Sequence, residues 1–139
     1  MAKVILDANV IISAAFGGKP LEAVAMALTN HEVYLTEFVV AELMGVLAKL
    51  SKRLSSEQMA FLQEKMGELV AMARVAPISS SVILSRDPND DHYLSLCKDT
   101  EADFLVTGDK DLLAISTKAL QKNGIVTRIM TPLDFLSEE

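Results

Sequence analysis

Residues 104–113 read FLVTGDKDLL and place a strand-like apolar run directly before a polar turn that contains Asp109 and Asp111. A short continuous apolar run is typical of a strand that is covered on both faces, as in a parallel sheet. The stretch VILDANVII at residues 4–12 repeats the arrangement, because its apolar run is followed at once by Asp7. Two buried strands that end in carboxylates predict a sheet with acidic side chains gathered at one edge.

Strand-like and helix-like segments alternate along the whole chain, which predicts an α/β sandwich with a mainly parallel sheet. Pro20 suits the first turn of a helix, and Ser55 and Gln58 have the spacing of a capping box. Strands are predicted at 3–6, 32–36, 103–107 and 125–130, with a short edge strand at 82–84. Helices are predicted from Pro20, over 37–50, from Ser55 to Ala73, from Asp90 or Asp91, from about Asp111 and, as one turn, after Pro132.

The length of 139 residues suits a single domain, predicted to span residues 1–139. Half of the residues are hydrophobic and the mean hydropathy is +0.30, which excludes a disordered chain. The lone cysteine, Cys97, cannot form an internal disulfide and is expected in the core, so a reducing compartment is the natural setting. The apolar runs after Lys3 and around Glu42 are too short or interrupted for a signal peptide or a membrane span. We therefore expect a soluble cytoplasmic protein.

Acidic residues recur where the predicted strands end. Four are expected at one edge of the sheet: Asp7 after the first strand, Glu42 on the helix after the second, Asp91 before the next strand, and Asp109 beyond it. Ligands of open parallel sheets bind at this edge. No Arg or Lys stands directly beside these acids in sequence except Lys110. Gathered carboxylates are costly unless a cation pairs with them, and oxygen ligands suit Mg²⁺ or Mn²⁺. Each acid alone has a simpler interpretation as a turn residue, a solvated helix residue or a helix cap, but their conjunction favours a metal site.

Four blocks of the chain resemble the signature blocks of PIN-domain proteins. They are VILDANVIISA (4–14), TEFVVAELMGVL (36–47), DPNDDHYLSLC (87–97) and ADFLVTGDKDLL (102–113). The resemblance is closest to the branch of toxin components from bacterial toxin–antitoxin pairs. It covers nearly the whole chain, because IVTRIMTPLDFL (125–136) resembles the final strand and terminal helix of that branch.

The resemblance implies an endoribonuclease that hydrolyses single-stranded RNA with Mg²⁺ or Mn²⁺ as its cofactor. It also implies a three-layer α/β/α sandwich with a mainly parallel central sheet. Homodimers are frequent in the family, and a small antitoxin protein often inhibits the nuclease. A homodimer and an antitoxin partner are therefore expected for this chain.

The resemblance also implies four catalytic and metal-binding acids: Asp7, Glu42, Asp91 and Asp109. Asp91 is preferred to Asp90 because its spacing to Leu94 fits the family block. Asp7 and Asp109 are the expected principal ligands, and the other two are further or water-bridged ligands. Three more positions are implied beside them: Asp111 as an outer metal ligand, and Asn9 and Thr107 as supporting polar groups.

The net charge of −6 argues against a nucleic-acid partner when taken alone. Leaving out the four site acids reduces it to −2, and two divalent ions would bring the loaded protein to about +2. Lys49, Lys52 and Arg53 are candidate phosphate contacts, or equally a solvated helix end that complements the helix dipole. So small a basic group predicts weak, salt-sensitive RNA binding.

Other functions fit the residues less well. A haloacid-dehalogenase-like phosphohydrolase needs a second acid two residues after Asp7, where the chain has Asn9. A response-regulator receiver needs an acidic pair before its first helix, and Asp7 stands alone. A non-catalytic RNA- or protein-binding module with the same fold remains an alternative. His92 is expected to be a solvated first-turn residue, with support of the neighbouring acid as the other interpretation.

Overall fold

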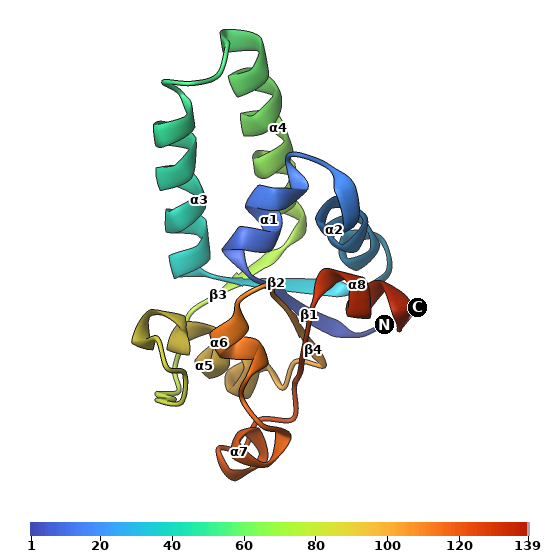
Figure 1. Ribbon diagram of the computed structural model, residues 1–139, viewed down its shortest axis with the longest axis vertical. Helices are drawn as coiled ribbons and strands as arrows, with labels where there is room; N and C mark the ends of the chain where they lie inside the picture. Colours follow the sequence, from blue (N-terminus) through green and yellow to red (C-terminus); the bar gives the residue numbers. More distant parts are fainter. Residues whose placement is uncertain (139) are drawn as a thin grey trace.

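The computed structural model describes residues 1–138 and has a five-stranded sheet at its centre (Figure 1). The strands are β1 (Lys3–Leu6), β2 (Glu32–Thr36), β3 (Arg74–Ala76), β4 (Phe104–Val106) and β5 (Arg128–Met130). They lie in the order β3–β2–β1–β4–β5, and every neighbouring pair is parallel. The strand order reverses direction at β1, so the crevice at the carboxyl ends of β1 and β4 is where such a sheet binds ligands.

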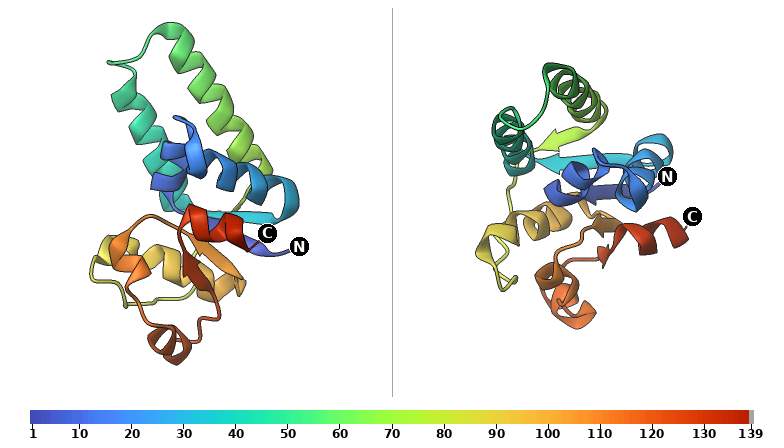
Figure 2. Two further views of the ribbon diagram at one scale, coloured as in Figure 1. Left: turned by 45° about the vertical axis from the view of Figure 1, so that its right-hand side comes forward. Right: turned by 45° about the horizontal axis from the view of Figure 1, so that its top comes forward.

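Helices cover both faces of the sheet, which confirms the predicted α/β/α sandwich. The helices α1 (Ala8–Ala14) and α2 (Gly18–Asn30) lie on one side, and α5 (Asp91–Thr100) lies on the other (Figures 1 and 2). Figure 1 shows α3 (Glu37–Leu50) and α4 (Ser56–Met72) as a hairpin that projects away from the sheet. The shorter elements are the 3₁₀ turn η1 (Pro88–Asp90), α6 (Lys110–Leu113), α7 (Thr117–Lys122) and α8 (Pro132–Ser137).

Polar residues at the strand ends start the helices that follow. Asp7 caps α1, Thr36 caps α3 and Asp109 caps α6, each accepting a backbone N–H from the first turn of its helix. The capping box predicted for Ser55 and Gln58 is present at the start of α4. These caps satisfy backbone donors that have no partner within the helix. They also hold three polar side chains at the same edge of the sheet.

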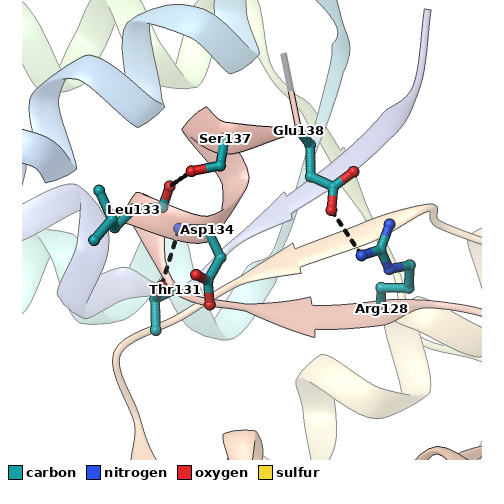
Figure 3. Close-up of polar contacts among 6 residues, drawn as sticks. All are labelled: Arg128, Thr131, Leu133, Asp134, Ser137 and Glu138. Atoms are coloured by element: carbon teal, nitrogen blue, oxygen red, sulfur yellow. Dashed lines mark hydrogen bonds and ion pairs between the residues drawn. The ribbon is translucent and has the colours of Figure 1, made fainter.

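The C-terminal helix α8 closes the core beside β4. Phe135 is fully buried, and its ring meets that of Phe104 edge to face at 5.8 Å. Thr131 caps α8 by accepting the N–H of Asp134 at 3.1 Å (Figure 3). Figure 3 also shows the ion pair of 2.7 Å between Arg128 on β5 and Glu138 just beyond the helix. The end of the chain is therefore tied to the sheet by packing and by polar contacts.

Cys97 is fully buried, which confirms its predicted place in the core. Burial raises the pKa of its thiol to about 12, so the side chain packs as a neutral group. Within residues 1–138 no single helix has the length and apolar character of a membrane span, although α1 and α2 together, bent by 110°, pass that test.

Residues 79–85, which we call the strap, replace the edge strand predicted at 82–84. The strap donates its backbone N–H groups to side chains of α5: Ser79 and Ser80 to Asp99, Val82 to Ser95, and Leu84 and Ser85 to Asp91. Because Asp91, Ser95 and Asp99 are four residues apart, they lie on one face of the helix and offer acceptors at regular intervals. The backbone of the apolar run at 82–84 is therefore hydrogen-bonded to side chains of a helix and not to a strand. The edge strand next to β2 is β3.

The helix α1 was not predicted, because the residues after Asp7 include a second run of β-branched side chains, at 10–12, and no helical periodicity. Val10, Ile11 and Ile12 are β-branched and have modest intrinsic helix propensity. Burial decides the conformation instead, because α1 packs Val10, Ile11 and Ala14 into the core. The cap formed by Asp7 is the local signal that separates the strand from the helix.

Candidate functional site

Asp7 lies at the carboxyl end of the central strand and is buried, with 2% of its surface exposed. Its Oδ1 accepts the N–H of Asn9 at 2.9 Å and the hydroxyl of Tyr93 at 3.2 Å. Its Oδ2 accepts the hydroxyl of Thr107 at 2.6 Å. A buried carboxylate is stable only when donors or cations surround it. These three donors therefore also fix the direction in which Asp7 points.

Thr107 connects Asp7 to Asp109. Its fully buried hydroxyl donates to Asp7 and accepts the backbone N–H of Asp109 at 3.0 Å. One side chain thus joins the ends of β1 and β4, as suits the supporting position predicted for it. Asn9, the other predicted supporting residue, contributes its backbone N–H and keeps its side chain exposed.

The carboxyl groups of Asp90 and Asp109 are in contact near Asp7. Burial, the contact with Asp109 and the negative charges of Asp109, Asp87 and Asp7 together raise the pKa of Asp90 to about 7. Oδ2 of Asp90 is buried and accepts no hydrogen bond within residues 1–138. A carboxylate offers no donor, so a bond between the two acids forms only when one of them is protonated. The two acids therefore share a proton or concentrate negative charge, and neither has a basic partner within residues 1–138.

Asp91, the acid preferred from the sequence, points to the strap instead. Its Oδ1 accepts the N–H of Leu84 at 3.1 Å and that of Ser85 at 2.8 Å. The turn η1 ends at Asp90 and leaves that residue beside Asp109, whereas Asp91 begins α5 and faces the opposite loop. The structure therefore brings Asp90 into contact with Asp109, whereas one oxygen of Asp91 is bound by the strap.

Glu42 and Asp111 lie at the margins of the acidic group. Glu42 is exposed on α3, and its charge is one of the causes, after burial and Asp7, that raise the pKa of Tyr93. Glu42 is thus within electrostatic reach of the site. Asp111 forms an ion pair with Arg86, whose Nε lies 3.3 Å from Oδ1 of Asp111. Arg86 precedes the turn η1 and lies 25 residues before Asp111, so no local sequence pattern indicated this pair.

A stack of three rings leads from Asp7 towards the surface: Tyr93, His92 and Phe38. The centroid of the His92 ring lies 4.0 Å from that of Tyr93 and 5.1 Å from that of Phe38. Nδ1 of His92 lies 3.1 Å from the hydroxyl of Thr36. Burial lowers the pKa of His92 despite the negative charges nearby, so its neutral ring can accept from that hydroxyl. The expectation that His92 is a solvated residue is wrong, because the ring packs between two others.

The basic residues considered as phosphate contacts, or equally as a solvated helix end, lie far from these acids. Lys49, Lys52 and Arg53 are at the far end of the α3–α4 hairpin, whereas Thr36 at the start of α3 belongs to the acidic edge. A helix rises 1.5 Å per residue, so the separation is roughly 20 Å. Arg86 is the basic side chain beside the acids.

The donor set fits a divalent cation by its chemistry. Asp7, Asp90 and Asp109 offer carboxylate oxygens only, which hard cations such as Mg²⁺ and Mn²⁺ prefer. The buried oxygen of Asp90 without a partner is the specific sign that a positive group is missing. Within residues 1–138 no three His, Cys, Asp or Glu side chains are already arranged to enclose an ion. The acidic side chains therefore lie near one another, but they do not surround a common point as the ligands of a bound ion do.

Comparisons with known proteins agree with this architecture. The profile of the PIN domain family matches residues 3–111, which include every acid of the candidate site. VapBC2 from Rickettsia felis, solved bound to a DNA fragment from their promoter, is 15% identical with a TM-score of 0.58, over 91% of this chain and 98% of that one. PAE2754 from Pyrobaculum aerophilum is 14% identical with a TM-score of 0.68, over 99% and 88% of the two chains. A domain of a functionally unknown protein from Methanocaldococcus jannaschii is 18% identical with a TM-score of 0.51, over 93% and 91%. At these identities the solved structures show a shared fold, and no curated protein matches the chain in sequence.

Proposed function

Since the chain belongs to the PIN domain family, we propose that it is a metal-dependent endoribonuclease that hydrolyses single-stranded RNA as the toxin of a toxin–antitoxin pair. The family supports a nuclease, and the likeness to VapBC2 supports a toxin–antitoxin role. The observation that carries the proposal is the acidic pair Asp90–Asp109 next to the buried Asp7. Such a cluster needs a cation, and a cation at this edge is what phosphodiester hydrolysis requires.

We assign Asp7, Asp90 and Asp109 as the groups that would hold Mg²⁺ or Mn²⁺. Glu42 flanks them from α3 and is a further ligand, direct or through water. Asp91 and Asp111, which the sequence also indicated as ligands, have other partners in the strap and in Arg86. A bound divalent ion supplies positive charge against the phosphate and lowers the pKa of the attacking water.

The residues around Asp7 would preserve the geometry that the ion requires. Thr107 and Tyr93 donate to different oxygens of Asp7, so the carboxylate cannot rotate without breaking a hydrogen bond. Such fixed orientation lowers the cost of ordering ligands at the moment of binding. The outer surface stays open to an extended RNA strand, because Glu42 and Phe38 are both exposed.

The substitution Asp7→Asn tests the proposal. The amide keeps the shape of the side chain but loses the charge, so cleavage of a single-stranded RNA in Mn²⁺ is expected to fall at least a hundredfold. Asp134→Asn on α8 is the matched control, because Asp134 is an exposed acid that is not part of the group formed by Asp7, Asp90 and Asp109. Wild-type cleavage by folded Asp7→Asn protein would overturn the assignment. RNA binding without cleavage by the wild-type chain would instead indicate the non-catalytic binding module.

A protein partner is the second part of the proposal. A groove of about 470 Å³ between α1, α2 and α4 is lined mainly by apolar side chains, including the exposed Leu21, Phe61 and Met72. Apolar surface of this kind marks protein interaction sites. We propose that the groove receives an apolar segment of a small antitoxin, encoded beside this protein, and that the pair acts in the cytoplasm.

Co-expression with the product of the adjacent small reading frame tests the partner. A stable complex is expected, with loss of RNA cleavage, and Phe61→Glu should release the partner and restore cleavage. The expected homodimer is examined in the same preparation by light scattering. If the chain occupies its own groove, Phe61→Glu will convert a dimer into a monomer whether or not the small protein is present, and this placement of the antitoxin would be wrong.

A further inference from the structure

A second hollow lies beside the acidic edge, between the first turn of α3 and the strap. It has a volume of about 520 Å³ and is lined by Phe38 on α3, His92 on α5, and Ile78, Val82 and Ile83 in and next to the strap. Its lining is thus partly apolar and partly aromatic. It adjoins the site through the ring stack, because His92 contacts both Phe38 and Tyr93, and Tyr93 donates to Asp7.

Phe38 is more exposed than a packing role explains, with 61% of its surface accessible. Phe16 and Phe61 are also exposed, but they line a separate hollow of about 340 Å³ next to α1 and α4. Within residues 1–138, Phe38 is therefore the exposed phenylalanine that lies against the acidic edge. Its ring rests on the half-buried His92, which limits its freedom and presents its outer side to solvent.

We propose that this hollow is a base-binding subsite in which Phe38 stacks on a nucleobase of the bound RNA. The inference rests on the proposed function and specifies how the substrate is held. Stacking on an aromatic ring requires an unpaired base, so the subsite selects single-stranded RNA and rejects duplexes. Ile83, with 84% of its surface exposed, and Val82 supply apolar contacts to the base from the strap.

The strap explains how a loop can form a reliable wall of this subsite. Its amide groups are fixed to Asp91, Ser95 and Asp99 along one face of α5. Ser95 and Asp91 both line the hollow as well. Asp91 therefore positions the wall of the hollow that faces Phe38. The residue before it, Asp90, is the acid that contacts Asp109.

The test compares Phe38→Leu, Phe38→Trp and the matched control Phe16→Leu, at another exposed phenylalanine, in cleavage of a short single-stranded RNA. Phe38→Leu is expected to raise KM about tenfold, equal to about 1.4 kcal/mol of lost binding, with kcat little changed. Phe38→Trp should have a KM close to that of wild type, because a larger ring stacks on the base at least as well. Phe16→Leu should leave both constants unchanged.

A second measurement does not depend on cleavage. A single-stranded RNA that carries 2-aminopurine is added to the Asp7→Asn protein, and stacking is read as quenching of its fluorescence. Quenching that disappears with Phe38→Leu supports the subsite even if the wild-type chain proves inactive on RNA, in which case only the proposed function fails. Equal KM and equal quenching in Phe38→Leu and wild type would overturn the subsite while leaving the nuclease intact.

Discussion

The hydroxyl of Thr107 lies 2.6 Å from Oδ2 of Asp7, and it joins the ends of two neighbouring strands. Both residues are buried, so the carboxylate depends on this donor and on Tyr93 in place of water. No basic residue forms an ion pair with Asp7 within residues 1–138. The site thus keeps a buried negative charge oriented by neutral groups, which leaves that charge available to a cation.

Thr107→Val tests the importance of this bond. Valine has nearly the same shape but no hydroxyl, so one oxygen of Asp7 loses its donor inside the protein. We expect a loss of roughly 1–3 kcal/mol in the free energy of unfolding, measured in urea with a chelator, and at least tenfold slower RNA cleavage. Thr107→Ser, which keeps the hydroxyl, should retain most of the free energy of unfolding and most of the cleavage rate. Unchanged unfolding of Thr107→Val would mean that another group satisfies Asp7.

Asp90 and Asp91 are predicted to fail in different ways. Asp90→Asn should reduce RNA cleavage by at least tenfold with little loss of stability, because Asp90 adjoins Asp109 and has an oxygen without a donor. Asp91→Asn should instead lower the thermal midpoint by a few degrees, because its oxygen accepts two strap amides. Paired melting curves and cleavage rates distinguish them. A greater loss of cleavage in Asp91→Asn would restore the register that the sequence indicated.

Much of the fold follows from local patterns. Lys3–Leu6, Glu32–Thr36 and the long helices from Glu37 and Ser56 appear where apolar periodicity and capping residues predicted them. The strap could not be predicted, because 82–84 has the composition of a strand and its amides are satisfied by side chains of a helix that comes later. The pattern of apolar and polar residues indicates which side chains are buried. It does not indicate which acceptors the backbone N–H groups bind.

The candidate site shows the same limit. The position of Asp7 and Asp109 at strand ends could be predicted, because parallel strands share one edge. Spacing to Leu94 could not decide between Asp90 and Asp91, because a 3₁₀ turn sets their directions and leaves no mark in the apolar pattern. Arg86 and Phe38 were missed because their neighbours at the site are far away in sequence.

Arg86 is expected to contact an RNA phosphate. Its Nε pairs with Asp111 at 3.3 Å, its side chain is 71% exposed, and its guanidinium has no other partner within residues 1–138. Arg86→Gln should raise KM and reduce the slope of log kcat/KM against log salt by about 0.7, the value for one contact with a single strand. Arg53→Gln, at the far tip of the helical hairpin, is the control and should change neither. Equal salt slopes for the two variants would exclude a phosphate contact at Arg86.

Asp111→Asn separates the two roles considered for Asp111. If it only pairs with Arg86, the variant should keep its full stabilisation by Mn²⁺, because no ligand is lost. If it binds the ion, the Mn²⁺-induced rise in thermal midpoint should shrink. The same loss is expected for a double variant that removes two assigned ligands, Asp7→Asn with Asp109→Asn. Thermal melting with and without a chelator gives the answer without any RNA.

The pH dependence of the metal-free protein follows from Asp90, whose pKa is raised from 3.8 to about 7. Below pH 3.8 both the folded and the unfolded chain hold this proton, so Asp90 does not affect the free energy of unfolding. Between pH 3.8 and about 7 the unfolded chain releases it while the folded chain keeps it, so stability falls as pH rises. Above about pH 7 the folded chain carries the extra charge and the full cost. In a chelator, Asp90→Asn should therefore gain stability relative to wild type as pH rises from 5 to 8.

The cation reverses this trend, because it replaces the proton. Mn²⁺ at a hundredfold excess over Kd adds about 2.7 kcal/mol to the free energy of unfolding, which is roughly 5 to 10 °C in thermal midpoint. This rise should be small at pH 5.5, where Asp90 is protonated, and full at pH 8. It should shrink at every pH in the Asp7→Asn, Asp109→Asn double variant, which loses two of the three assigned ligands. If millimolar Mn²⁺ does not change the thermal midpoint between pH 5.5 and pH 8, the acids at the strand ends serve only as caps of their helices.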